Sequence, residues 1–226
     1  MTIRKLIVAL GAFGAATLAQ AEGFYVTGAL GQAEWRKAGE YDRQIGAAVD
    51  CTPTCDSQSV KTKKNATGSK LGAGYRINNR FAVELTHNKT RAFKTRINQD
   101  YTSALGTVYS IDEEQSLISY NYTGLLFVPL GQRLELFGRL GVANWRVKEK
   151  WHDGCSNAAL ACNSGGYDRD THWSPTYGLG LAMNVTRNVA VTTEWERMGG
   201  KAQIFQRQFK QDYTIDHFSL GLRIGF

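Results

Sequence analysis

Beyond its first residues, the chain has no long apolar run of the kind that crosses a membrane as a helix. Such a helix needs roughly 20 consecutive apolar residues. The longest uncharged apolar stretch, Leu117–Gln132, contains Asn121 and Pro129, and its apolar residues alternate more than they cluster. A membrane protein with this sequence would therefore be a closed β-barrel, because only helices and closed barrels satisfy their own backbone hydrogen bonds in lipid.

Residues and motifs that carry chemistry are also few. The 226 residues include 4 histidines, 4 cysteines and 3 prolines. No glycine-rich phosphate loop follows a strand and opens a helix. Cys51 and Cys55 have no histidine nearby, and His152 lies beside Cys155 without the spacing of a structural zinc site. We therefore expect no cofactor, no bound metal and no enzyme activity.

What the chain does have is a period of two, clearest in its last nine residues, FSLGLRIGF. One face carries Phe218, Leu220, Leu222, Ile224 and Phe226, and the other carries Ser219, Gly221, Arg223 and Gly225. A strand with one apolar and one polar face suits a wall between lipid and a polar lumen. The 24 glycines, 10 tyrosines, 10 phenylalanines and 5 tryptophans fit the same class.

The beginning of the chain predicts export. Arg4 and Lys5 precede the apolar run Leu6–Leu18, and Ala19-Gln20-Ala21 has the form of a signal-peptide cleavage site. We predict a signal peptide over Met1–Ala21 and a barrel domain over Glu22–Phe226. The alternative, a single spanning helix, is disfavoured because the run is short and a processing site follows it at once.

Eight strand-like runs divide the mature chain. They are Gly23–Arg36, Thr67–Asn78, Arg80–Lys94, Glu113–Val128, Arg133–Lys148, His172–Val185, Asn188–Met198 and Tyr213–Phe226. Each is long enough for a tilted strand across a bilayer, which needs about 9–11 residues. The predicted fold class is all-β: an eight-stranded antiparallel up-and-down transmembrane β-barrel.

The links between these runs alternate in length. They are long after Arg36, Lys94 and Lys148, and short around Asn79 and Arg187. In outer-membrane barrels the long links lie outside the cell and the turns lie in the periplasm. Seven links between eight strands would place both ends of the mature chain in the periplasm. We find no linker and no second domain.

Four segments carry a family resemblance. They are SKLGAGYRINNRFAVELTHN at Ser69–Asn88, RLELFGRLGVANWRV at Arg133–Val147, SPTYGLGLAMNVTRNVAVTTEWERMG at Ser174–Gly199, and the closing FSLGLRIGF. In these strands, but not in its long loops, the chain resembles the eight-stranded transmembrane domain of OmpA-like proteins. The resemblance implies that the barrel-assembly machinery reads the terminal strand ending at Phe226. The best-known members continue into a peptidoglycan-binding domain, whereas this chain stops at Phe226, so we expect no cell-wall anchor.

Strand parity predicts a charged lumen. The residues expected to point inward are Lys70, Arg76, Glu84, Arg133, Glu135, Arg139, Glu194, Glu196 and Arg223. Eight strands enclose room for side chains but not for a wide channel, and charges held away from water should pair. The resemblance implies the same, since family members fill the lumen with ion pairs and carry inward glutamates where this chain has Glu84 and Glu194. We favour a polar plug, with a narrow gated ion path as the alternative.

His217 and Ser219 form the one candidate catalytic pair. They are similar to the His and Ser that lipid A deacylase barrels use, together with an acid, on the outer wall. Here both would face the lumen, because Phe218 and Leu220 occupy the lipid side, and the Ser-Asn continuation of that family is missing. We therefore favour a polar lumen pair over a lipid-modifying site.

The four cysteines lie in two long links, Cys51 and Cys55 in CTPTC and Cys155 and Cys162 in CSNAALAC. An even count in an exported chain indicates disulfides, and three pairings are possible. Closeness in sequence favours Cys51–Cys55 and Cys155–Cys162, each closing its own loop. A cross-loop pairing would instead tie the first and third outer loops together.

Charge and export together suggest the partners. The formal net charge of +7 falls to +5 without Arg4 and Lys5, and the charges are scattered. We expect no nucleic acid, and outer-membrane lipid and anionic lipopolysaccharide as partners. We therefore expect an integral outer-membrane protein of a Gram-negative bacterium with a structural or surface-contact role: envelope integrity, adhesion, or contact with lipopolysaccharide or host molecules at its outer loops. The alternative is a narrow channel for ions or small solutes, and a lipid A-modifying enzyme is a third reading.

Overall fold

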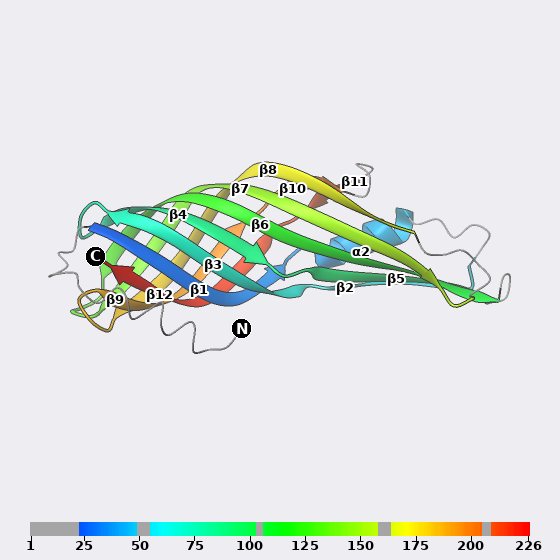
Figure 1. Cartoon of the computed structure of the whole chain (residues 1–226), viewed down its shortest axis with the longest axis horizontal. Coiled ribbons are helices and arrows are strands. Elements are labelled where there is room, and N and C mark those ends of the chain that lie inside the picture. The colour runs from blue at the N-terminus through cyan, green and yellow to red at the C-terminus, as the bar shows by residue number, and fades with distance from the viewer. Residues whose placement is uncertain (1–22, 49–54, 103–105, 158–163, 205–208) are drawn as a thin grey trace.

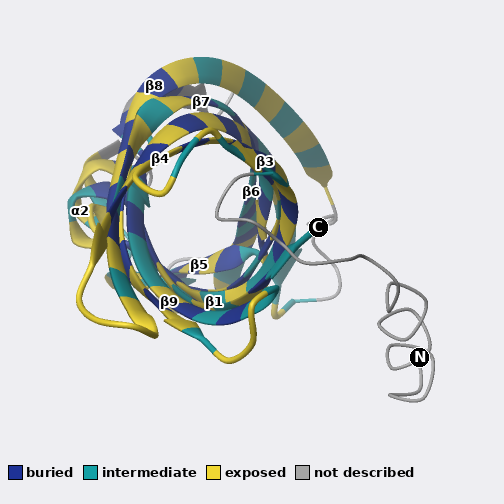
Figure 2. Ribbon diagram, turned by 90° about the vertical axis from the view of Figure 1, so that its left-hand side faces the viewer, coloured by how far each residue is buried: buried dark blue, intermediate teal, exposed yellow. Residues whose placement is uncertain are grey.

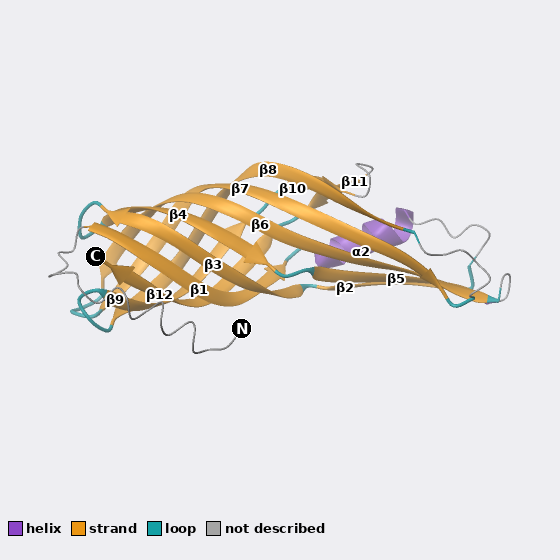
Figure 3. Ribbon diagram, viewed as in Figure 1, coloured by secondary structure: helices purple, strands orange, loops and turns teal. Residues whose placement is uncertain are grey.

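The computed structural model describes residues 23–48, 55–102, 106–157, 164–204 and 209–226. These residues form mainly strands (Figure 3). No helix in these ranges is long and apolar enough to cross a bilayer. The predicted signal peptide, Met1–Ala21, lies outside the described residues and stays a prediction.

The elements of the described residues are one helix and strands that pair antiparallel, several of them with partners that are not adjacent in the chain. They are β1 (Gly23–Trp35), α2 (Ala38–Ala48), β2 (Ser57–Lys63), β3 (Asn65–Arg76), β4 (Phe81–Thr90), β5 (Phe93–Tyr101), β6 (Thr107–Pro129), β7 (Leu134–Cys155), β8 (Gly165–Asn184), β9 (Val189–Met198), β10 (Lys201–Ile204), β11 (Phe209–Asp212) and β12 (Ile215–Gly225). A small separate hairpin pairs β10 with β11.

Eight strands close into a ring in the order β1, β3, β4, β6, β7, β8, β9, β12 and back to β1. The long β6–β7 ladder, from Tyr109↔Cys155 to Pro129↔Glu135, completes the closure. Seen from one end, the ribbons form a closed ring, whose interior we call the bore, and buried and exposed residues alternate along them (Figure 2). The predicted eight-stranded antiparallel barrel is confirmed.

An apolar belt surrounds the ring. We use this name for the exposed side chains Phe24, Leu30, Leu71, Phe81, Leu85, Leu126, Val128, Leu140, Trp173, Leu179, Met183, Phe218 and Leu222. Leu30, Leu71 and Leu140 are 68%, 67% and 69% exposed. Such a belt of outward apolar residues, alternating with inward small or polar ones, is the pattern of strands that face lipid.

The short links gather at one end of the barrel, together with the start of β1 and the end of the chain (Figure 1). We call this the turn end. In the β3–β4 turn, the Asn78 Oδ1 atom accepts hydrogen bonds from the amides of Arg80 and Phe81 at 2.8 and 2.9 Å. Side-chain capping of this kind favours Asn in tight turns. The amide of Phe226 donates to the carbonyl of Phe24 at 2.9 Å, so the last residue extends the ladder that joins the two ends of the barrel.

At the other end, five strand arms rise beyond the belt on one side of the barrel (Figure 1). This wall consists of β2, β5 and the distal arms of β6, β7 and β8. The sequence predicted long loops over much of this region. That prediction was wrong, because β2 and β5 carry on from β3 and β4, and β7 continues to Cys155 instead of ending at Lys148.

Helix α2 packs against the inner face of the wall. Its buried residues Ala38, Tyr41 and Ile45 are spaced by three and four positions, so they share one helix face. They join a cluster that includes Phe93 and Ile97 of β5. The wall is stable because this burial gives its inner face an apolar partner, although its outer face is polar.

The belt predicts a cost for charge in lipid. Changing Leu179 or Leu222 to Arg should lower the free energy of unfolding by about 2–4 kcal/mol, because the guanidinium would face hydrocarbon. The matched control is Tyr167→Arg, which places the same side chain on β8 at a 79% exposed position of the wall. Reversible urea unfolding in lipid vesicles measures all three, and equal losses at Leu179 and Tyr167 would contradict the position of the belt.

Candidate functional site

Five charged side chains from four strands meet inside the bore. We call them the charge cluster: Lys70 of β3, Glu84 of β4, Arg139 of β7, and Glu194 and Glu196 of β9. Lys70, Glu84 and Arg139 are each 4% exposed and Glu196 is fully buried. They meet because alternate residues of each strand face the bore, while their neighbours Leu71, Leu85 and Leu140 face outward.

Arg139 and Lys70 share the carboxylates of the cluster. Arg139 Nη2 lies 2.7 Å from Glu84 Oε1, and Arg139 Nε lies 2.6 Å from Glu194 Oε1. Lys70 Nζ lies 2.9 Å from Glu194 Oε1 and 2.5 Å from Glu196 Oε2. Glu194 therefore bridges the two cations, and the cluster is one connected network.

Neutral donors bind the second carboxylate oxygens of Glu84 and Glu196. The Tyr25 hydroxyl donates to Glu84 Oε2 at 2.9 Å. The Asn121 amide and the Thr176 hydroxyl donate to Glu196 Oε1 at 2.7 and 3.1 Å. Three carboxylates face two cations, and these dipoles help to stabilise the excess negative charge. Buried charges are tolerated only when they are paired and hydrogen-bonded in this way.

Closer to the turn end, the bore is filled by aromatic rings and two arginines. Arg223 lies over the rings of Tyr25, Phe127 and Phe137, at 5.2, 5.0 and 5.1 Å from their centroids. These distances suit cation–π attraction. Arg76 forms a two-pronged pair with Glu135, at 3.2 and 2.9 Å.

The residues predicted for the lumen thus occupy different places. Five form the charge cluster, Arg76 pairs with Glu135 apart from it, and Arg223 lies among aromatic rings. Arg133 does not lie with them. It is exposed in the β6–β7 turn, one residue before β7 begins, where strand parity no longer determines direction.

At the wall end, a third layer closes the bore. The outer seal consists of Trp35, Phe93, Trp145 and Tyr213, all 1% exposed or less. The Trp35 and Tyr213 rings are stacked with centroids 4.8 Å apart, and Trp145 lies 6.3 Å from Tyr213. Trp35 Nε1 donates to the carbonyl of Asp212 at 3.0 Å, which satisfies its buried donor. The bore is therefore filled by charges in the middle and by aromatic rings above them.

Beyond the seal, helix α2 covers a buried acid pair that the sequence analysis did not identify. Glu113 and Glu149 are each 1% exposed. The Tyr41 hydroxyl donates to Glu113 Oε2 at 2.5 Å, and Gln115 Nε2 lies 3.1 Å from Glu113 Oε2 and 3.5 Å from Glu149 Oε1. Burial, with the nearby Glu149 charge, raises the pKa of Glu113 to about 7. The inward parity of Glu113 was available in the sequence, but α2 as its cover was not.

His217 and Ser219 are not joined by a hydrogen bond in the described part of the chain. The His217 ring is 2% exposed and packs against Gly68, where a Cβ would lie 2.3 Å from Nε2. Within the described part of the chain, neither ring nitrogen of His217 has a hydrogen-bond partner. A general base needs a hydrogen bond to its nucleophile and an orienting acid. Among the described residues, no three His, Cys, Asp or Glu side chains are grouped to hold a metal.

Cys55 and Cys155 lie at the far end of the wall. Cys155 ends β7, and Cys55 precedes β2. Neither is a free thiol. Their predicted partners, Cys51 and Cys162, lie outside the described residues, so the pairing remains a prediction.

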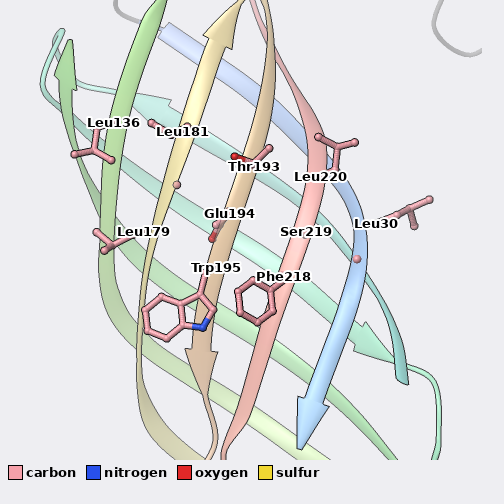
Figure 4. A pocket seen from close by; sticks show the side chains of 12 residues that line it. Leu30, Leu136, Leu179, Leu181, Thr193, Glu194, Trp195, Phe218, Ser219 and Leu220 are labelled. Carbon is pink, nitrogen blue, oxygen red and sulfur yellow. The ribbon is translucent and has the colours of Figure 1, made fainter. Parts of the chain in front are cut away.

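A depression of about 600 Å³ lies on the outside of the ring (Figure 4). Leu30, Leu179, Trp195 and Phe218 surround it, and the smaller Thr193 lies at its floor. Its rim belongs to the apolar belt, so its chemistry suits lipid chains and not a polar substrate.

Comparison with known proteins agrees with this geometry. A family model described as the outer membrane protein beta-barrel domain matches residues 6–226.

The crystal structure of Neisserial surface protein A is similar, with a TM-score of 0.55, 14% identity, and coverage of 90% of this chain and 97% of that one. A structure of Ail, the attachment invasion locus protein of Yersinia pestis, solved with the heparin analogue sucrose octasulfate, has a TM-score of 0.47 and 18% identity, covering 90% and 99% of the two chains. The outer membrane protein OprG from Pseudomonas aeruginosa has a TM-score of 0.47 and 12% identity, covering 91% and 97%. The search of curated proteins found no match. At these identities the solved structures show the fold alone.

The charge cluster predicts a strong dependence on Arg139. Arg139→Met should lower the free energy of unfolding by about 3–5 kcal/mol, because Glu84 and Glu194 would lose a buried partner. Adding Glu84→Gln should recover part of the loss. Arg76→Met is the matched control and should cost less, because the Arg76–Glu135 side chains are 18% and 15% exposed. Urea unfolding in vesicles measures each, and a negligible cost for Arg139→Met would contradict the network.

The acid pair predicts a pH-dependent cover. The Glu113 pKa is about 7 in the folded protein, against an ordinary value of 4.5 for a glutamate carboxyl, so the folded state holds the extra proton between these values. The contact of α2 with the wall should be most stable at low pH and lose about 3 kcal/mol as the pH rises through 7. Hydrogen exchange of the α2 amides from pH 5 to 8 measures this after correction for intrinsic rates. Glu113→Gln should abolish the dependence, and Glu114→Gln, on the outer face, should retain it. A dependence unchanged in Glu113→Gln would assign it to another group.

Proposed function

The chain belongs to the family of outer-membrane β-barrel proteins, and we propose that it is a closed barrel that acts by surface contact and not by transport or catalysis. Its place is the outer membrane, with the turn end in the periplasm and the wall outside the cell. The contacts would serve envelope integrity, adhesion, or binding to lipopolysaccharide or host molecules.

One observation carries this proposal: the bore is filled at three levels, by the rings and arginines near the turn end, by the charge cluster and by the outer seal, and the molecule instead extends its surface outward. The charge cluster connects side chains of β3, β4, β7 and β9 across the bore, with pairs as close as 2.5 Å. The outer seal fills the bore again with stacked rings. An eight-stranded ring has little room beyond such side chains. The wall meanwhile carries its polar outer face away from the apolar belt (Figure 1).

The tip of the wall is the proposed site of contact with other molecules. Cys55 and Cys155 both lie there, beside the ladder pairs Asp100↔Ser57 and Tyr109↔Cys155. We propose that the disulfides Cys51–Cys55 and Cys155–Cys162 hold the loops of this tip. Disulfides closing such short loops remove little chain entropy, so their role is to shape the loops and not to stabilise the barrel.

The terminal strand supports the proposed contact with the barrel-assembly machinery. β12 ends beside Phe226, and the start of β1 pairs with it, so this seam joins the first and last strands of the ring. An exposed strand edge is a template for pairing until the ring closes. The terminal aromatic therefore lies at the seam where assembly has to finish.

A narrow channel is the second candidate function, and it has a direct test. Purified protein in planar bilayers should show no steady, discrete openings. Trp145→Ala should remain silent as well, because the charge cluster still fills the bore beneath the altered seal. Tyr167→Ala, at an exposed position of the wall, is the matched control. Stable openings of the unaltered protein would overturn the closed barrel, and openings in Trp145→Ala alone would make the outer seal a gate.

A further inference from the structure

A basic hollow lies on the outer surface of the barrel, at the foot of the wall. It has a volume of about 450 Å³. Lys63, Arg91 and Lys94 supply its cations, and Gln32, Asn65 and Thr67 supply neutral polar groups. No part of the charge cluster or the outer seal contributes to it, since these face the bore.

Two neighbouring breaks in the strands create this hollow. Lys64 separates β2 from β3, and Arg91 and Ala92 separate β4 from β5. The carbonyl of Lys64 accepts from the Trp35 amide, and the carbonyl of Thr67 accepts from the Arg91 amide, both at 2.8 Å. The breaks are therefore anchored by the backbone. β1 ends here and β2 becomes the edge of the wall, so one side of the hollow is open.

The hollow lies directly above the apolar belt. On β1 and β3 the pair Gln32↔Thr67 lies two residues beyond Leu30↔Ser69 in the same ladder. Two residues of a strand rise about 6.7 Å. Leu30 and Leu71, at 68% and 67% exposure, are the belt residues below it. The hollow is thus at the depth where the headgroups of the outer leaflet meet the protein.

The cations of the hollow outnumber the carboxylates that are paired with them. Among the described residues, neither Lys63 nor Arg91 has a carboxylate partner, while Lys94 lies 2.7 Å from the exposed Glu114. Lys61 and Lys89 are exposed on the same outer face, adding to the positive field. Glu34 on β1 is paired with Lys64 at 3.2 Å. A net positive concavity remains.

We propose that this hollow binds the phosphorylated sugar headgroup of the outer-leaflet glycolipid, the lipid A part of lipopolysaccharide. The ammonium and guanidinium groups are strong donors to phosphate. The amides of Gln32 and Asn65 and the Thr67 hydroxyl match sugar hydroxyls. The acyl chains of the same molecule would descend over Leu30 and Leu71. The proposal rests on the surface-contact function, for which it names one ligand and one site.

Binding to purified lipid A in detergent micelles tests the site. The variant Lys63→Gln/Arg91→Gln/Lys94→Gln should bind bisphosphorylated lipid A about tenfold more weakly than the unaltered protein, because it loses the charged donors. The matched control is Arg80→Gln/Arg133→Gln/Arg187→Gln, which removes the same charge from the turn end and should bind normally. A heat-modifiability gel establishes that each barrel is folded.

The ligand arms identify the chemistry. Lipid A from which both phosphates have been removed should bind the unaltered protein as weakly as bisphosphorylated lipid A binds the Lys63→Gln/Arg91→Gln/Lys94→Gln variant, which we call the hollow variant. Inorganic phosphate and phosphatidylglycerol micelles, at the same concentration of phosphate groups, should not displace bisphosphorylated lipid A. Displacement by either would show that the hollow binds anions in general and not the glycolipid. Equal losses of affinity in both triple variants would show that binding depends only on the net charge of the protein. Full binding by the hollow variant would also overturn the site. If the unaltered protein shows no openings in planar bilayers, the proposal of a closed barrel stands whatever the binding results are. The two proposals can therefore fail separately.

Discussion

Backbone amides in hydrocarbon have no water to bond with, and this constraint governs the rest of the molecule. It requires the β6–β7 ladder to close the ring, because an open sheet would expose two unpaired edges to lipid. Closure divides the side chains into two sets with different surroundings, lipid outside and a narrow bore inside. The bore then has to be filled, and its charged side chains are paired, as in the network of Lys70, Arg139 and their carboxylates, or lie against aromatic rings, as Arg223 does.

The same division explains which parts of the fold could be predicted from the sequence. Where one face meets lipid, apolar and polar residues must alternate, so the eight membrane strands and the inward direction of Glu84 and Glu194 follow from parity. Above the membrane the outer face meets water, and its charged residues obscure the pattern. In β5, Phe93 and Ile97 point inward, but the charged Lys94 and Arg96 lie between them, so the segment has the composition of an exposed loop.

The parts of the site that escaped prediction depend on distant contacts. Glu113 is buried only because α2, 72 residues away in sequence at Tyr41, lies over it. No local pattern around Glu113 contains that information. Arg133 shows the opposite effect, since its parity suggested the bore, but it lies one residue before β7, where the turn sets its direction. Parity is therefore informative within a ladder and loses its meaning at the ladder's end.

In the described residues, the wall rises on one side of the ring, so the barrel presents different surfaces in different directions within the plane of the membrane. β9, β12 and β1 end low, and on that side α2 covers the inner face of the wall (Figure 1). On the other side a neighbour meets the basic outer face and its hollow. Rotation about the membrane normal therefore changes which surface a neighbour encounters, and two copies side by side would present unlike faces unless they turned toward each other.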